Sequence, residues 1–433
     1  MGGAAVSKES YVRRRLSRRF GVVVVAGTLA LGLIGAMPFA ASAQVFRRVP
    51  CVPCPREIPS ETTTQPERTG EATGQAGVAA EQPGEGQPPT PPSDLFAQQD
   101  VGAPSGPESV GQTMIGDFFG GGLLSLSIQQ EVYEIDRRAP LPGASVPRFK
   151  MAENTSPLPQ DRIYFDYSFY RNVPVSTPDI DVSAFTLGFE ETFLGGAMSF
   201  EMRLPMSNTI GNDVFLDGRP NSLQGEVGNL GMAFKGLLVH RERFALSAGL
   251  AMTVPTAQGT RYFVTGGDAP DFTISNDSVH LMPFVGGLWT PSDRFFAMGY
   301  LQVDVDANGD GVLANDGGGG FTPAGRFSEP TVMYIDLALG YWARRSDCTR
   351  RLLTGLAYVV ELHMNQALGS SSTTSVGEAS LATPSISVLD LTVGAHLDIR
   401  RNTTLTAAFC TPLTNGQDRQ FDGQFRLFVN RRF

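Results

Sequence analysis

The stretch that decides the fold is Leu389–Arg400, LDLTVGAHLDIR, near the C-terminus. Its odd-numbered positions are apolar, and its even-numbered positions are polar, charged or small. Side chains of a β-strand alternate between two faces, so this stretch predicts a strand with one apolar and one polar face. A soluble β-sandwich shows the same period with its apolar face inward. The period alone therefore leaves a sandwich and a membrane barrel both open.

The same alternation recurs from residue 160 to the end of the chain. It predicts twelve strands, at residues 161–170, 180–190, 196–205, 228–240, 243–254, 279–289, 294–306, 331–344, 352–366, 385–400, 402–412 and 420–433. Most are long enough for the roughly 9–11 residues that a tilted strand needs to cross a bilayer.

The connections between these segments alternate in length, which separates the two readings. Short turns fall near 191–195, 241–242, 290–294, 345–351 and 401. Longer polar loops fall near 206–227, 255–278, 307–330 and 367–384, with smaller ones near 171–179 and 413–419. Short periplasmic turns and long outer loops are typical of bacterial outer-membrane barrels. We therefore predict an all-β fold, a transmembrane antiparallel up-and-down barrel of about 12 strands in residues 160–433.

Aromatic residues agree with this orientation. Phe193, Trp289, Phe295, Tyr341 and Phe433 fall at the predicted periplasmic ends, as an interfacial girdle would.

The last strand carries a further pattern. Its apolar positions include Phe425, Leu427 and the terminal Phe433 on one face. The pattern resembles the C-terminal signal by which the barrel-assembly machinery recognises its clients.

The N-terminal part predicts export. Six cations precede an apolar run from Gly21 to Ala40, and Ala41-Ser42-Ala43 has the small-x-small pattern of a signal-peptidase site. We predict a signal peptide at 1–43, with an uncleaved anchor as the alternative. Residues 44–110 are rich in Pro, Gly, Glu and Gln, which predicts a disordered periplasmic linker. Residues 111–159 are expected to form a periplasmic segment, a plug or a first barrel segment.

Charge and cysteine usage narrow the partners. Without residues 1–43 the chain keeps 28 basic and 42 acidic residues, a net charge of -14, which argues against nucleic acid. Cys51 and Cys54 are close enough to form a small disulfide loop after export, or else they are two free thiols.

Two stretches carry a family resemblance. Gly228–Lys235, GNLGMAFK, resembles the Gly-Asp-Leu-x-Leu-x-x-Lys strand of outer-membrane channels associated with meta-pathway phenol degradation, with Asn229 where Asp is usual. Phe149–Asn154 and the stretch from Ser156 to Tyr167 resemble uncharacterised planctomycete barrel proteins. The resemblance covers about residue 113 to the end and implies a porin-like or transporter barrel. It transfers no catalytic residues.

One acidic stretch is a candidate calcium site. Asp304, Asp306, Asn308 and Asp310 alternate like the start of a calcium loop. The closing bidentate carboxylate is missing, because Asn315 or Gly317 stands at the twelfth position. A strand that runs into a polar turn explains the stretch better, so we expect no metal and no cofactor.

Catalysis is also not expected. A twelve-stranded barrel can be a phospholipase, which needs a serine activated by a histidine. His363 and His396 fall on the polar face, but neither has a serine two residues away and no elbow motif is present. We predict that the chain is not an enzyme.

The polar face of the strands predicts the lining of the lumen. The titratable residues that share this face are Glu190, Glu201, Arg203, Lys235, Asp336, Glu361, His363, Asp390, His396, Asp398, Arg400, Asp422 and Arg426. Eight strands are filled by side chains and 16 to 18 leave an aqueous channel, so twelve predict a narrow pore.

The functional prediction follows from these features. We expect an outer-membrane channel for passive passage of small solutes, with its linker in the periplasm. Membrane lipid, the barrel-assembly machinery and small solutes are the expected partners. The alternative is a non-conducting structural barrel that anchors the linker and displays surface loops.

Overall fold

The computed structural model describes residues 112–120, 123–129, 134–143, 146–176, 178–346, 351–369, 373–376, 379–383, 385–400 and 402–433. The expected signal peptide, the linker, Cys51 and Cys54 lie outside these residues. Among the residues described, no helix has the length and apolar character to cross a membrane.

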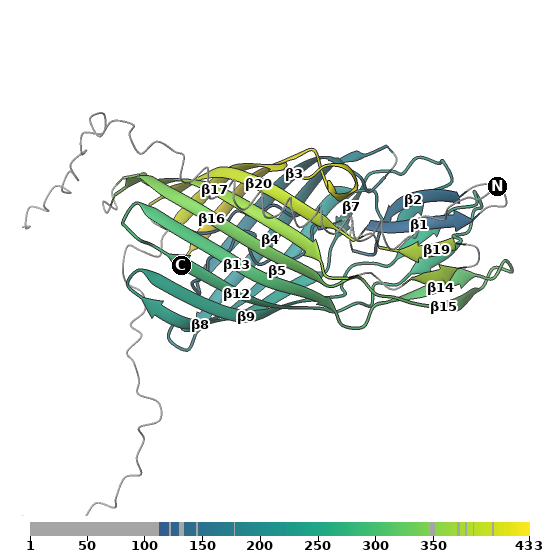
Figure 1. The fold of residues 1–433 in the computed structure, drawn as a ribbon, viewed down its shortest axis with the longest axis horizontal. Helices are drawn as coiled ribbons and strands as arrows, with labels where there is room; N and C mark the ends of the chain where they lie inside the picture. Colours follow the sequence, from purple (N-terminus) through teal and green to yellow (C-terminus); the bar gives the residue numbers. More distant parts are fainter. Residues whose placement is uncertain are drawn as a thin grey trace, which may run out of the picture. The chain divides into compact units, whose positions relative to one another are not determined.

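Within the described residues, twelve antiparallel strands close into a barrel, which confirms the predicted fold class (Figure 1). The strands are β3 (Arg162–Val173), β4 (Ile180–Phe193), β5 (Met198–Thr209), β8 (Leu230–Arg241), β9 (Phe244–Val254), β12 (His280–Trp289), β13 (Phe295–Asp306), β16 (Val332–Arg345), β17 (Leu353–Ala367), β20 (Ser387–Ile399), β21 (Thr403–Pro412) and β22 (Gly423–Arg432). Each pairs with the next. The last strand, β22, pairs with the first, β3, so that Phe425 lies opposite Phe169. Closure satisfies the main-chain groups that an open edge would leave unpaired.

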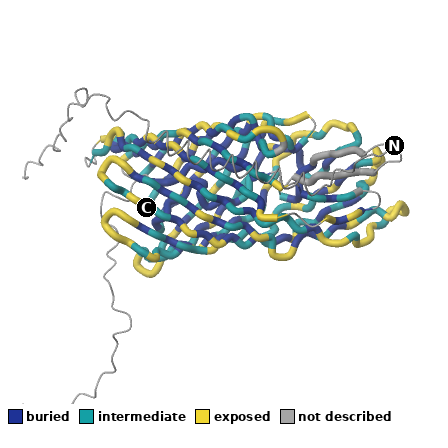
Figure 2. The backbone as a smooth tube through the Cα atoms, in the orientation of Figure 1, coloured by how far each residue is buried: buried dark blue, intermediate teal, exposed yellow. Residues whose placement is uncertain are grey.

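The two faces of the barrel wall have the reverse polarity of a soluble protein. Along β17, Tyr358 and Val360 are 53% and 50% exposed, whereas Glu361 and His363, further along the strand and on its other face, are buried. Figure 2 shows the same alternation of buried and exposed positions along the strands. Apolar side chains therefore cover the outside, and the ionisable side chains of this strand point into the barrel.

One end of the barrel carries short turns, and we call it the turn end. The opposite loop end is built up by two further sheets (Figure 1). One contains β6 (Asp213–Phe215), β10 (Thr260–Phe263), β11 (Phe272–Ile274), β14 (Asp310–Asn315) and β15 (Phe321–Phe327). The other contains β1 (Leu123–Gln129), β2 (Glu134–Pro140), β18 (Thr374–Val376) and β19 (Ala379–Ala382). Strand β7 (Gln224–Val227) extends the pairing of β5, and a 3-10 turn, η2, spans Gly416–Asp418.

These loop-end sheets differ from the polar loops that the sequence predicts. They enclose an apolar cluster that includes Tyr262, Phe272, Ile274, Val312 and Phe327, all buried. Strands of three to seven residues are too short to show a clear period, and their partners lie far away in the chain. No local pattern in the sequence therefore predicts these short strands.

Packing inside the barrel depends on glycines that face aromatic side chains. Gly340 lies opposite Phe296 on the neighbouring strand, and a Cβ at Gly340 would overlap the Phe296 ring. Gly287 is different, because the nearest atom to a Cβ there is 3.9 Å away.

We predict that Gly340→Ala lowers the free energy of unfolding by about 1–3 kcal/mol, the usual cost of overpacking. Gly287→Ala, the matched control, should change it little. Thermal unfolding in detergent micelles, followed by circular dichroism, measures both, and equal melting temperatures would contradict the packing argument.

Candidate functional site

The interior of the barrel is filled by two segments that precede β3. These are residues 112–120 and 146–160, which we call the plug. Almost every plug residue is buried. Plug atoms bond to inward-facing side chains on β3, β5, β8, β13, β16, β17, β20 and β22. The plug therefore occupies the space that the sequence analysis assigned to a pore.

The first plug segment is held by a wall carboxylate. The main-chain N–H groups of Ile115 and Gly116 donate to Glu361, at 2.8 and 2.9 Å. Thr392 donates its hydroxyl to the carbonyl of Gly116, at 3.1 Å. Gly116 has φ 88°, and a Cβ there would come within 2.7 Å of Glu153 on the second segment. Only glycine allows this close approach at a left-handed position.

The second plug segment is held mainly by basic side chains of the wall. Arg203 donates to the carbonyl of Lys150 at 3.0 Å, and Lys235 donates to the carbonyl of Ser156 at 2.8 Å. The side-chain oxygen of Gln302 accepts from Met151 N at 2.7 Å. These bonds satisfy main-chain groups that have no strand partner.

On one side of the wall, the charged side chains form ion pairs with one another. Arg162 pairs with Glu190 at 2.8 Å and with Glu201 at 3.2 Å. Arg203 also pairs with Glu201, at 2.9 Å, and Lys235 with Glu190, at 2.8 Å. All five side chains are at most 6% exposed. Buried charges of this kind are tolerated only when they are paired and hydrogen-bonded.

The other side, on β16, β17 and β20, depends on the plug. Lys150 places its ammonium 2.6 Å from both Asp336 of the wall and Asp117 of the plug. His363 contacts Asp336 at 2.8 Å and Glu361 at 3.2 Å. Asp117, Asp336 and His363 are grouped closely enough to hold a metal ion, but Lys150 already lies against both carboxylates.

The lumen also has an apolar part, which the sequence did not predict. Inward-facing residues of β12, β13 and β16 join plug residues in one buried cluster. Its larger members are Met114, Ile115, Phe149, Met151, Met282, Phe284, Leu288, Phe296, Met298, Tyr300, Trp342 and Phe428.

Most of the residues predicted to line the lumen are inside the barrel. Those at most 5% exposed on the wall are Glu190, Glu201, Arg203, Lys235, Asp336, Glu361, His363, Asp390, His396, Asp398 and Arg426. Arg400 lies instead in the exposed turn after β20. Asp422 lies at the loop end, where it accepts from Asn172 at 2.6 Å and pairs with Arg419 at 2.7 Å.

Several charged residues of the site were not predicted from the sequence. Arg162 and Asp166 share the inward face of β3, so their parity could have identified them. The plug contributes others, among them Asp117, Lys150 and Glu153, and it has no period from which to read a face.

The four residues of the candidate calcium site accept hydrogen bonds within the loop end. The contacts are His280 Nδ1 to Asp304 at 2.7 Å, Gly309 N to Asp306 at 2.7 Å, Val279 N to Asn308 at 2.8 Å and Ser278 N to Asp310 at 2.8 Å. Three of the four donors are main-chain N–H groups, so these oxygens stabilise the turn after β13.

The three residues of the C-terminal pattern lie on the outer surface. Phe425 and Leu427 are 44% and 41% exposed on β22, and Phe433 is 71% exposed beyond its end.

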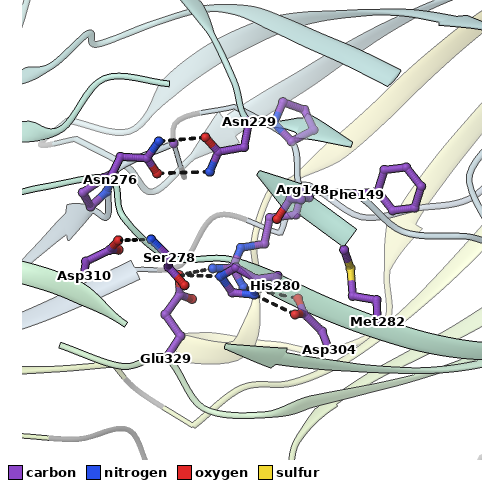
Figure 3. Close-up of a pocket in the computed structure, with 14 residues that line it drawn as sticks. Arg148, Phe149, Asn229, Asn276, Ser278, His280, Met282, Asp304, Asp310 and Glu329 are labelled. Carbon is purple, nitrogen blue, oxygen red and sulfur yellow. Dashed lines mark hydrogen bonds and ion pairs between the residues drawn. The ribbon is translucent and has the colours of Figure 1, made fainter. Parts of the chain in front are cut away.

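Two small cavities flank the plug. The first, of about 40 Å³, lies at the loop end among Arg148, Asn229, His280, Asp304 and Glu329 (Figure 3). Arg148 pairs there with Glu329 and lies 3.8 Å from Asp304. The second, of about 30 Å³, lies between the plug and the walls of β3, β4, β5 and β22. Its lining includes Glu153, Asp166, Arg203 and Arg426. Each cavity has room for only a few water molecules.

No protein-family model matches the chain, and no curated protein does. Solved outer-membrane barrels are similar to it at low identity. An outer-membrane channel from Pseudomonas putida F1 is 12% identical over 64% of this chain and 97% of that chain, with a TM-score of 0.43. The β domain of the Bordetella autotransporter Brka is 11% identical over 63% and 100%, with a TM-score of 0.40, and the NanC porin is 8% identical over 63% and 98%, with a TM-score of 0.36. These values are too low to carry an argument, so the barrel rests on its own strand pairing.

The buried ion pairs allow a direct test. We predict that Arg162→Met lowers the free energy of unfolding by about 3–5 kcal/mol, because Glu190 and Glu201 lose a buried partner. Arg261→Met is the matched control. Its pair with Asp213 lies at the surface, where the arginine is 57% exposed, and should contribute below about 1 kcal/mol. Urea unfolding in micelles measures both variants, and similar losses would contradict the assignment.

A second test uses pH at the loop end. Burial raises the pKa of Asp310 to about 6, against the lowering effect of main-chain bonds from Asp277 and Ser278. The ordinary value is 3.8, so the folded protein binds this proton more tightly than the unfolded chain does. Asp310 therefore adds stability as pH falls from about 7 towards 4.

Asp310→Asn should remove that part of the pH dependence while its amide oxygen keeps the main-chain bonds. Melting temperatures at pH 7.5 and pH 5 measure the difference. An unchanged pH profile in the variant would contradict the raised pKa.

Proposed function

We propose that this protein is an outer-membrane channel for small polar solutes and that its own plug holds it closed. The reversed polarity of the wall supports a membrane location, because an apolar outer surface with fully paired main-chain groups is what a lipid bilayer accepts. At the turn end, Phe193, Trp289, Phe295 and Phe433 are exposed at 39–71%, as residues of an interfacial belt would be.

The observation that carries the proposal is the charged wall behind the second cavity. Arg203 and Arg426 line it from β5 and β22, and Asp166 lines it from β3. The plug supplies the opposite surface through Glu153. A shift of the plug away from this wall would join the cavity to the loop end through Arg148 and Phe149, which border both cavities. Solutes would then pass along a charged surface that water can solvate.

Plug movement is linked to the loop end by the chain itself. The two plug segments are joined through the β1–β2 hairpin, and β1 pairs with β19 in a loop-end sheet. We infer that solute binding or a partner at the loop end opens the channel by pulling on this hairpin. With the turn end facing the periplasm, the hairpin lies outside the cell.

The apolar cluster of the lumen favours the second candidate, a non-conducting structural barrel. Phe296 of β13 and Trp342 of β16 belong to this cluster and fill the lumen at the turn end. A solute could pass them only along the charged side of the lumen.

Conductance of planar bilayers distinguishes the two. Arg203→Ala removes the bonds to Lys150 and Thr155, at 3.0 and 2.5 Å, and widens the second cavity. We predict rare openings for the wild type and at least a tenfold higher open probability for Arg203→Ala.

Arg219→Ala is the control, since Arg219 pairs with Asp217 at the exposed loop end. Heat-modifiable migration in gels shows that each variant is folded. Folded Arg203→Ala that stays silent in bilayers, and that leaves liposomes impermeable to small sugars and amino acids, would establish the structural barrel instead.

A further inference from the structure

The surroundings of Lys150 form a cage for an ammonium group. Its Nζ lies 2.6 Å from Asp117 and from Asp336 and 2.7 Å from the side-chain oxygen of Asn365. The rings of Phe118 and Tyr334 lie 5.6 and 5.4 Å from it, within the range of cation–π attraction. Lys150 is fully buried, so the cage contains the whole ammonium group.

Part of this cage belongs to the wall and remains when the plug moves. Asp336 and Tyr334 are on β16, and Asn365 is on β17. In the strand register, His363 lies opposite Asp336 on one neighbouring strand and opposite Asp390 on the other. The wall thus holds the acceptors and one aromatic face, while the plug supplies the cation.

The acidic groups of this wall have one basic wall residue, His363, among their described partners. On the opposite wall, Glu190 and Glu201 each meet two basic side chains from β3, β5 or β8. Here the described contacts of Asp336 and Glu361 with basic wall residues involve only His363. Asp336 Oδ2 and both carboxylate oxygens of Asp390 are buried and accept no hydrogen bond among the described residues. Withdrawal of Lys150 would leave this surface in need of a cation.

We propose that the wall site of Asp336, Asn365 and Tyr334 binds the primary ammonium group of a solute and that Lys150 is its tethered occupant in the closed state. The inference rests on the proposed channel function and names its solute class, small molecules with a primary ammonium on a short alkyl stem. The Asp336 carboxylate and Asn365 accept the N–H bonds of the ammonium, and Tyr334 covers the adjoining methylene groups. Lys150 and the solute then compete for one site, so occupancy by solute keeps the plug displaced.

Chemical rescue of the full-length Lys150→Ala variant tests this proposal. The substitution removes three methylene groups and the ammonium group, so it leaves a cavity of the size of a propylammonium ion. We expect a lower melting temperature than the wild type, and a saturable rise of several degrees on addition of propylammonium. Propanol and sodium chloride, at equal concentration and ionic strength, should give no saturable rise. If the variant folds poorly, the yield of heat-modifiable barrel on refolding with and without propylammonium measures the same binding.

Two further variants make the result specific. Lys150→Ala combined with Asp336→Asn should bind propylammonium at least tenfold more weakly. Lys235→Ala is the matched control, because Lys235 also bonds a plug carbonyl and a wall carboxylate, yet Glu190 keeps Arg162 as a partner. Equal rescue of Lys150→Ala and Lys235→Ala, or no rescue of Lys150→Ala, would overturn the cage.

Bilayer recordings of Lys150→Ala separate this inference from the proposed function. In this variant the free ion replaces the missing ammonium between Asp117 of the plug and Asp336 of the wall, so it should favour closure. Openings that propylammonium reduces in a saturable way support both. Openings that the amine does not affect overturn the ammonium site and leave the channel. Amine-dependent stabilisation without any openings supports the ammonium site and argues against the channel.

Discussion

Charged side chains are enclosed inside this barrel, so each needs a partner that the protein itself supplies. Taking a charge out of water costs several kcal/mol, and only close, well-oriented partners offset that cost. On β3, β4, β5 and β8 the partners are neighbours on the wall, as with Arg162 and Glu190. On β16, β17 and β20 the principal cation is Lys150, which arrives from another part of the chain. The plug is therefore an electrostatic component of the barrel as well as a filler.

This arrangement explains why the plug has few regular elements of its own. Its main-chain groups bond to side chains of the wall, such as Glu361, Gln302 and Arg203. A segment held in this way needs no internal ladder, but it needs the correct wall residues at the correct depth. These hydrogen bonds would exchange for water in the open state that we propose for the channel. The apolar cluster around Phe296 and Trp342 does not share this property and gives the turn end a fixed core.

The loop end links the plug to the outside of the barrel. The β1–β2 hairpin connects the two plug segments and joins the sheet of β18 and β19. The neighbouring sheet has its own apolar core around Tyr262 and Phe272, so the loop end is a folded layer. Tyr262 also donates to the carbonyl of Pro140 in the hairpin, at 2.7 Å. The loop-end layer is therefore joined to the plug by covalent connections and by this hydrogen bond.

The sequence by itself determined the strands, because a period of two is a local property that each strand displays in its own residues. The alternating lengths of the connections then distinguished a barrel from a sandwich. Leu389–Arg400 reveals both of its faces without reference to any other segment, and the inward charges Asp390, His396 and Asp398 follow from that period. Only the tertiary structure decided what fills the lumen. Asp117 and Lys150 carry no periodic signal, and their role arises from contact with Asp336 and Asn365, more than 180 residues further along the chain. Such pairing depends on three-dimensional closure of the barrel, which places distant residues within hydrogen-bonding distance and excludes the water that would otherwise separate them.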